Sequence, residues 1–103
     1  MELNVTLLNF LRYEDKDTKK PKIRIGYINN DKAYIENTDK FKGYAELSVY
    51  IDDKDFWNFF KTEMTGDTAI FTFAKRPNPR NPLKDVTVLQ SIKTNKHGDI
   101  SLL

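Results

Sequence analysis

The chain contains no cysteine and only one histidine, and these absences exclude several kinds of site. Disulfide bonds, thiolate metal centres and cysteine nucleophiles all need a sulfur that the 103 residues do not supply. His97 lies beside Gly98 in the turn-like stretch TNKHG, which favours an exposed turn residue. One imidazole does not build a zinc site from histidines, and a Ser-His-Asp triad is equally unexpected here. We therefore expect no metal and no cofactor.

Sequence motifs that carry catalytic chemistry are also missing. The chain has four glycines and contains no GxGxxG, P-loop or GxSxG pattern. The acidic run at 52–55, DDKD, lacks the glycine and the terminal glutamate of a calcium loop, and the start of a helix explains it better. The run at 14–17, EDKD, indicates a solvated turn. We therefore expect no catalytic residues and a protein that is not an enzyme.

Long apolar runs are absent as well. No stretch approaches the roughly 20 apolar residues that a membrane-spanning helix needs. Residues 1–17 lack the basic start and the small-residue cleavage site of a signal peptide. We expect a cytoplasmic protein without a membrane partner. Its net charge of +2 permits a polyanionic partner but does not demand one, so the distribution of charge must decide.

Aromatic rings must fill the core, because only 39% of the residues are apolar and a third of those are aromatic, at 13% of the chain. The length indicates one domain, residues 1–103. Short runs with alternating or β-branched residues are separated by polar turns, which predicts a mainly β fold. The expected strands are 2–13, 22–28, 40–51, 68–75 and 83–93. Residues 32–36 fit either a short hairpin strand or part of a long loop, and residues 99–103 fit either a terminal strand or a loose end. The proline-rich segment 76–82 is expected to be irregular.

The segment 41–61 changes its period in the middle. Up to Ile51 the residues alternate, so that Phe41, Ala45, Leu47, Val49 and Ile51 share an inner face. After Asp52 and Asp53, either of which can cap a helix, the aromatic residues Phe56, Trp57 and Phe60 fall on one helical face. We expect a helix over about 53–63.

Three strands, a short helix and two strands resemble the OB-fold, a five-stranded, partly open barrel. Within that fold, residues 41–74 look like the corresponding part of single-stranded DNA-binding proteins of phages, plasmids and other mobile elements. The resemblance implies that the aromatic helix plugs one end of the barrel. It also implies protection of single-stranded DNA in replication, recombination or transfer, in a bacterial host cell. Nucleic acid would lie on the outer face of the second and third strands and on two flanking loops.

Binding of a single strand needs rings that stack on bases and cations that follow the phosphates. Tyr44 and Tyr50 are expected on the outer face of the third strand, where packing alone does not favour two rings. Loop 76–82 and its flanks carry the most basic stretch of the chain. The expected nucleic-acid-binding residues are Lys22, Arg24, Tyr34, Lys42, Tyr44, Tyr50, Lys75, Arg76 and Arg80.

Other interpretations of the same residues stay open. The exposed tyrosines also suit a protein-interaction module, such as a small phage-encoded inhibitor of a host protein, because tyrosine and arginine are favoured in protein interfaces. Tyr44 and Tyr50 could also pack against side chains of neighbouring strands. RNA as a second ligand is open, and so is a homodimer, because an incompletely closed barrel leaves strand edges that can pair. Phe10 and Tyr13 are not assigned to core or surface by their pattern.

Overall fold

The computed structural model describes residues 1–31, 35–37, 39–78 and 80–103, and for residues 35–37 and 82 it describes only the backbone. Within this part of the chain the regular structure is almost entirely β, as expected. The elements are β1 (Glu2–Glu14), β2 (Pro21–Asn29), β3 (Ile35–Asn37), β4 (Lys42–Tyr44), β5 (Leu47–Asp52), the 3-10 turns η1 (Trp57–Phe59) and η2 (Thr62–Met64), β6 (Thr68–Asn78), β7 (Asn81–Thr94) and β8 (Asp99–Ser101).

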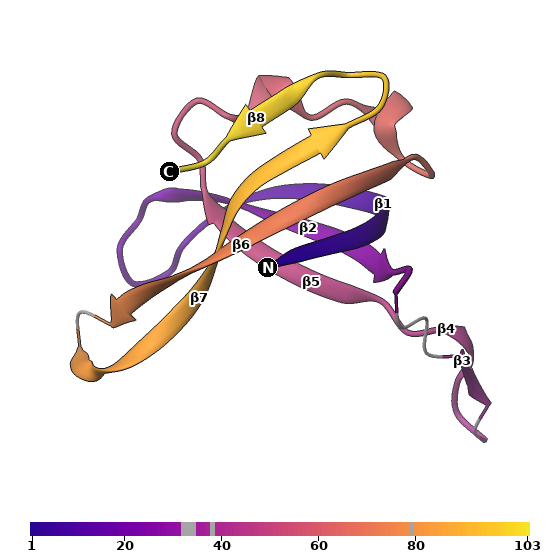
Figure 1. Ribbon diagram of the computed structural model, residues 1–103, viewed down its shortest axis with the longest axis horizontal. Helices are drawn as coiled ribbons and strands as arrows, with labels where there is room; N and C mark the ends of the chain where they lie inside the picture. The colour runs from indigo at the N-terminus through magenta and orange to yellow at the C-terminus, as the bar shows by residue number, and fades with distance from the viewer. Residues whose placement is uncertain (32–34, 38, 79) are drawn as a thin grey trace.

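Six strands form one antiparallel sheet in the order β5-β2-β1-β6-β7-β8, and β3 and β4 form a separate hairpin (Figure 1). The sheet curls so that residues from distant strands meet. Ile51 of β5, Leu89 of β7 and Leu102 after β8 belong to one buried cluster. The sheet does not close, because β5 pairs only with β2 among the described strands. A cleft of about 220 Å³ separates β5 from β7 and the C-terminal residues.

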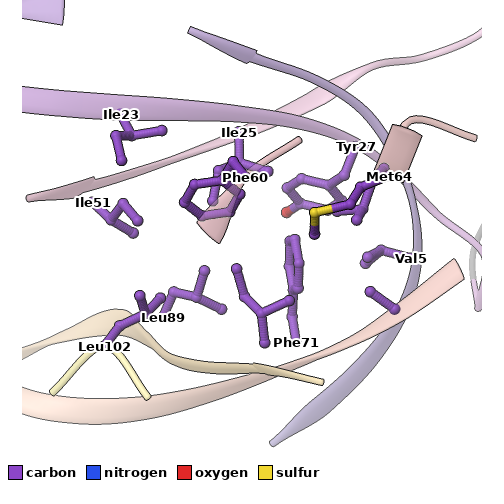
Figure 2. Packing of buried hydrophobic residues seen from close by; sticks show 13 residues of the cluster. Val5, Ile23, Ile25, Tyr27, Ile51, Phe60, Met64, Phe71, Leu89 and Leu102 are labelled. Atoms are coloured by element: carbon purple, nitrogen blue, oxygen red, sulfur yellow. The ribbon is translucent and has the colours of Figure 1, made fainter. Parts of the chain in front are cut away.

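The core lies on the concave side of this sheet, where aliphatic side chains surround a few rings (Figure 2). Phe71 of β6 is fully buried and meets Tyr27 of β2 edge-on, with ring centroids 5.0 Å apart. Phe73 lies next to Phe71 and packs against the same core. Burial raises the pKa of Tyr27. Rings thus join β2, on one side of β1 in the sheet, to β6, on its other side.

A bulge in β1 inverts its alternation halfway along the strand. Val5 and Leu7 face the core, and the register to β2 then shifts between Leu7 and Asn9. Beyond the shift Phe10 turns inward against Phe60, with centroids 4.9 Å apart. The next residues, Leu11 and Tyr13, consequently turn outward. A β-bulge places two residues opposite one and so reverses which face the following side chains occupy.

The helix expected over 53–63 is wrong. The segment instead forms the two 3-10 turns η1 and η2, and the chain is extended at Lys61 between them. Asp55 has a left-handed backbone with φ 65°, which interrupts a helix at its start. Aromatic residues also lose side-chain freedom in a helix. Two separate turns allow Phe60 and Met64 to enter the core, whereas Phe56 and Trp57 are only partly buried against it.

Asp53 holds this segment to the sheet. Its Oδ1 accepts hydrogen bonds from the backbone N–H groups of Phe56 and Trp57, at 3.2 and 3.3 Å. Its Oδ2 lies 2.7 Å from Nε of Arg12, and only 1% of the Asp53 side chain is exposed. The capping role predicted for this region therefore belongs to Asp53, although the element that it caps is a 3-10 turn.

Replacing Asp53 with alanine is expected to lower the free energy of unfolding by about 2–3 kcal/mol, because the cap is lost and two backbone donors lose their acceptor. The exposed Arg12 can return to water, so the penalty stays below that of a fully buried ion pair. Urea unfolding measures the change. Asp53→Asn keeps an acceptor for the turn but loses the charge, and it should cost less. Equal losses in the two variants would contradict the capping role.

The continuous strand expected at 40–51 is also wrong. The chain leaves the sheet before Leu47, and residues 42–44 pair with 35–37 instead. The pairing of β5 with β2 ends where Leu47 meets Tyr27, two residues before β2 itself ends at Asn29. Gly43, with φ 121°, adopts a backbone that other residues avoid. Phe41 is 44% exposed and Leu47 37%, so neither is the core residue expected.

The proline-rich segment was expected to be irregular, and this is wrong too. β6 continues through Pro77 to Asn78, and β7 begins at Asn81. Each strand of a two-stranded ribbon has one free edge, where a proline without an N–H is tolerated. The ribbon projects beyond the core as an arm, at the lower left of Figure 1. The radius of gyration is 14.8 Å, compared with about 13 Å for a compact domain of this length.

No helix among the described residues is long and apolar enough to cross a membrane.

Candidate nucleic-acid interface

The convex side of β1, β2 and β5 presents two tyrosines and two cations side by side. The register places Tyr13 beside Lys22, and Lys22 beside Asp52. One step along, Leu11 lies beside Arg24, and Arg24 beside Tyr50. We call the following set the outer face: Leu11, Tyr13, Lys22, Arg24 and Tyr50.

Strand alternation fixes the direction of these side chains. Ile23, Ile25 and Ile51 are buried on the concave side, so their neighbours along β2 and β5 must point to the convex side. The sequence predicts this for Lys22, Arg24 and Tyr50. Lys22 and Arg24 are half-buried, whereas Tyr50 is 59% exposed.

The two tyrosine rings reach toward each other across β2. Their centroids are 6.3 Å apart and the rings are nearly perpendicular, at 87°. In an edge-to-face pair the edge of one ring contacts one face of the other, so the contact orients both rings and leaves the remaining ring faces uncovered by it. Leu11 extends the same surface and is 47% exposed. The result is a partly apolar surface that carries two rings on the exterior of a small protein.

The cations next to these rings differ in how they are held. Nζ of Lys22 lies 3.3 Å from Oδ1 of Asp52, an ion pair whose acid is largely exposed. Such a pair is weak in water and easily exchanged for another anion. Nε of Arg24 is buried and has no hydrogen-bond partner within the described residues. The N–H groups of a guanidinium donate hydrogen bonds, and phosphate oxygens are favourable acceptors for them.

An acidic side chain, Glu46, lies at the end of the outer face opposite Lys22. Oε1 of Glu46 accepts a hydrogen bond from Nδ2 of Asn9 at 2.9 Å, and the two side chains cross over Gly26. A Cβ at this glycine would meet both side chains, so at least one of them would have to shift. The carboxylate places a negative charge at this end, whereas Lys22 and Arg24 lie at the other end of the outer face.

The β1–β2 loop, residues 15–20, is ordered by Asp15. Hydrogen bonds from the backbone N–H groups of Thr18 and Asp17 hold the pKa of Asp15 below its usual value. Lys19 adopts a left-handed backbone with φ 62°, and it lines a shallow hollow with Arg12 and Tyr13. The loop therefore brings an exposed ammonium next to the outer face.

The structure separates the other predicted residues from this face. Lys42 and Tyr44 are exposed on the β3–β4 hairpin, and Tyr44 is 56% exposed. Lys75, Arg76 and Arg80 are exposed on the β6–β7 arm. In Figure 1 the arm projects to the lower left of the view and the hairpin to the lower right, from opposite ends of the sheet. Tyr34 lies outside the described residues.

Sequence reasoning missed two members of the outer face, Leu11 and Tyr13. A strict alternation from Leu3 onward would send both inward. A signal of the reversal was present, because Asn9 is polar at an inward position of that pattern and Phe10 is apolar at an outward one. It also missed Leu83, which is 96% exposed on the β6–β7 arm.

His97 was expected as an exposed turn residue, and it is half-buried instead. Its Nε2 lies 3.5 Å from Oδ2 of Asp67, and its backbone N–H donates to Oγ1 of Thr94. That hydroxyl donates in turn to the carbonyl oxygen of Gly98. These contacts close the β7–β8 turn, and in them the hydroxyl of Thr94 acts as both a donor and an acceptor. Among the described residues no cluster of three or more metal-ligating acidic, histidine or cysteine side chains occurs.

Comparison of the chain with known protein families, curated proteins and solved structures finds no match. The functional argument therefore depends on the geometry of the site.

Proposed function

We propose that the protein binds single-stranded DNA without strong sequence preference, by stacking bases on Tyr13 and Tyr50 and by contacting phosphates with Lys22 and Arg24. The observation that carries the proposal is the tyrosine pair, an exposed Tyr50 and a half-buried Tyr13, that spans β2 beside these two cations. Stacking is worth about 1–3 kcal/mol per base and tolerates any base, because every base has a flat face. Two rings therefore compensate for a net charge of only +2.

The fold assigned with this function is a partly open OB-type barrel of five strands, β1, β2, β5, β6 and β7. The strand order supports it, because β5 and β7 lie near the two ends of the curled sheet and both line one cleft. The segment with η1 and η2 takes the place of the plugging helix, since Phe60 and Met64 enter the core from it. In such a barrel the second and third strands carry the ligand, and here these are β2 and β5.

The β3–β4 hairpin and the β6–β7 arm then act as flanks. Lys42 and Tyr44 on the hairpin, and Lys75, Arg76 and Arg80 on the arm, keep the roles expected from the sequence, as secondary contacts to phosphates and bases. Their exposure supports this assignment. Protection of single strands during replication, recombination or transfer of a mobile element fits a small binder of this kind.

Binding of a fluorescent oligothymidine is expected to weaken about 20-fold between 50 and 200 mM salt. About three phosphate contacts would release counterions and give this dependence for a single strand. Fluorescence anisotropy at the two salt concentrations measures it. Oligouridine and a blunt duplex serve as competitors, which also decides whether RNA is a second ligand. A protein that binds none of these oligonucleotides at 50 mM salt would contradict the proposal.

A protein-interaction module is the second candidate function, because the same exposed tyrosines and Arg24 suit a protein interface. The free edge of β5 favours it specifically, since β5 pairs only with β2 among the described strands and an extended chain could add there. A second copy is one such partner. Light scattering of the free protein tests for a homodimer, and loss of the dimer on replacing β5 residues with proline would locate it.

A further inference from the structure

The β6–β7 arm carries an apolar side chain that projects alone. Pro77 pairs with Asp85 and Asn78 pairs with Asn81, so three extra residues, 82–84, bulge from β7 between these two pairs. Leu83 lies at the centre of the bulge and is 96% exposed. No other large apolar residue among the described side chains is as exposed; Met1 follows at 77%.

The bulge is fixed by local chemistry. Pro82 has no N–H with which to continue the ladder, which favours a break at this point. The backbone N–H of Leu83 donates to Oδ1 of Asn81 at 3.3 Å, and that of Arg80 donates to Oδ1 of Asn78 at 3.0 Å. The first of these contacts restrains the backbone at Leu83, which lowers the loss of conformational freedom when this residue meets a partner.

Cations surround this leucine. Lys84 follows it in the bulge, Arg80 lies in the tip, and Lys75 and Arg76 lie along the stem, all four exposed. Asp85 is the single acidic residue on the arm. The arm therefore combines an apolar point with a positive stem, a combination that matches the stacked bases and the phosphates of a nucleic acid.

The length of the β6–β7 arm suits the major groove of duplex DNA. From Phe73, where core contact ends, to Asn78 at the tip, the arm extends roughly 17 Å at the rise of a β-strand. The major groove of duplex DNA is about 8.5 Å deep and admits a two-stranded β-ribbon. The arm can thus reach the base pairs while the body of the protein stays outside the duplex.

We propose that the β6–β7 arm recognises the junction between single-stranded and double-stranded DNA, with Leu83 packed on the exposed face of the last base pair. This inference rests on the proposed binding of single strands, and it adds a second element to the ligand. Lys84 and Arg80 contact the phosphates of the duplex end, while the outer face holds the single-stranded tail.

A junction fits better than the interior of a duplex. Inserting a side chain between stacked bases requires unstacking them, and burial of one leucine offsets this cost only in part. The last base pair before a single-stranded tail already exposes one face, so no unstacking is needed. A lipid surface is a poorer match, since stable membrane binding needs a broad apolar face rather than one side chain.

The test compares three labelled DNAs by anisotropy: a duplex with a single-stranded tail, the tail alone and the blunt duplex. The wild-type protein is expected to bind the tailed duplex about tenfold more tightly than the tail, the gain from burying most of one leucine side chain. Both tail polarities are measured. Leu83→Ala should bring the two affinities within about twofold of each other and leave tail binding unchanged. The adenine analogue 2-aminopurine in the last base pair should respond to the wild-type protein and not to Leu83→Ala.

Leu103→Ala is the matched control, because Leu103 is an exposed leucine outside the arm, and it should keep the junction preference. Equal affinity of the wild type for tail and tailed duplex overturns the junction inference but leaves the proposed function standing, and so does a preference that survives Leu83→Ala. Tight, Leu83-dependent binding of the blunt duplex overturns it in favour of an interior site. Binding to none of the DNAs, with Leu83-dependent binding to phosphatidylserine vesicles, overturns both proposals.

Discussion

Replacing Tyr13 and Tyr50 together with alanine is expected to weaken binding of single-stranded DNA by about 100-fold, since each stacking ring contributes about 1–3 kcal/mol. Both rings lie on the outer face and contact each other edge-to-face. Titration of a labelled oligothymidine measures the change. The free energy of unfolding should fall by only about 1 kcal/mol, because the lost ring pair is partly exposed.

The two single replacements should not add up to the double one. When one ring is removed, the other loses the contact that orients it, so each single variant loses part of the second ring's contribution. We expect each single variant to lose more than half of the double variant's effect, in free energy. A purely additive result would mean that the two rings act at separate places on the DNA.

Replacement of both tyrosines with phenylalanine discriminates stacking from hydrogen bonding. Phenylalanine keeps the ring face and loses only the hydroxyl, so DNA affinity should stay within about threefold of the wild type if stacking dominates. Tyr44→Ala is compared with this pair, because Tyr44 lies on the β3–β4 hairpin, away from the outer face, and as a secondary contact it should cost less affinity than the outer-face pair. A larger loss from Tyr44→Ala than from the outer-face pair would move the site to the hairpin.

The sequence predicts the strand-rich fold and the outward direction of Lys22, Arg24 and Tyr50, because hydrophobic alternation is strong in β2 and β5. It does not predict Tyr13. A single bulge after Leu7 reverses the alternation, and the position of a bulge depends on how two strands pair. The polar Asn9 and the apolar Phe10 signal a break in the alternation, but they do not locate the residues that pair on either side of it.

The errors at 41–61 have a common physical origin. Aromatic spacing favoured a helix, but the core accepts Phe60 and Met64 from separate turns, and tertiary burial outweighs the propensity of a short segment. Similarly, alternation favoured one long strand up to Ile51, yet a strand persists only where a neighbour supplies hydrogen-bond partners. The pairing with β2 begins only at Leu47, and residues 42–44 pair with 35–37 instead.

The prolines were misjudged for a related reason. They were taken to exclude regular structure, whereas a two-stranded arm has edges that need no donor. The arm therefore forms, and Leu83 is left exposed in its bulge. Exposure of a single side chain follows from the register of two strands, so no composition or spacing rule could have found it.

Replacing Phe71 with alanine is expected to lower the free energy of unfolding by about 3–5 kcal/mol, the cost of removing a fully buried ring and leaving a cavity. A domain of this size has only about 5–15 kcal/mol in total. The urea midpoint should therefore fall by more than about 1 M. Leu83→Ala, an apolar truncation at an exposed position, should change stability by less than about 0.5 kcal/mol.

The Phe71 variant also tests how the sheet curls. Phe71 in β6 touches Tyr27 in β2, although β1 separates these strands in the sheet. Burial raises the pKa of Tyr27, so its neutral form is favoured in the folded protein and this contribution to stability is lost as the pH rises through the raised pKa. Water entering the cavity of Phe71→Ala should move the pKa of Tyr27 back toward its ordinary value, which absorbance titration of the folded variant measures. An unchanged titration, together with a small loss of stability, would mean that the two halves of the sheet do not meet across this ring, and the convex face built on their curvature would then have a different shape.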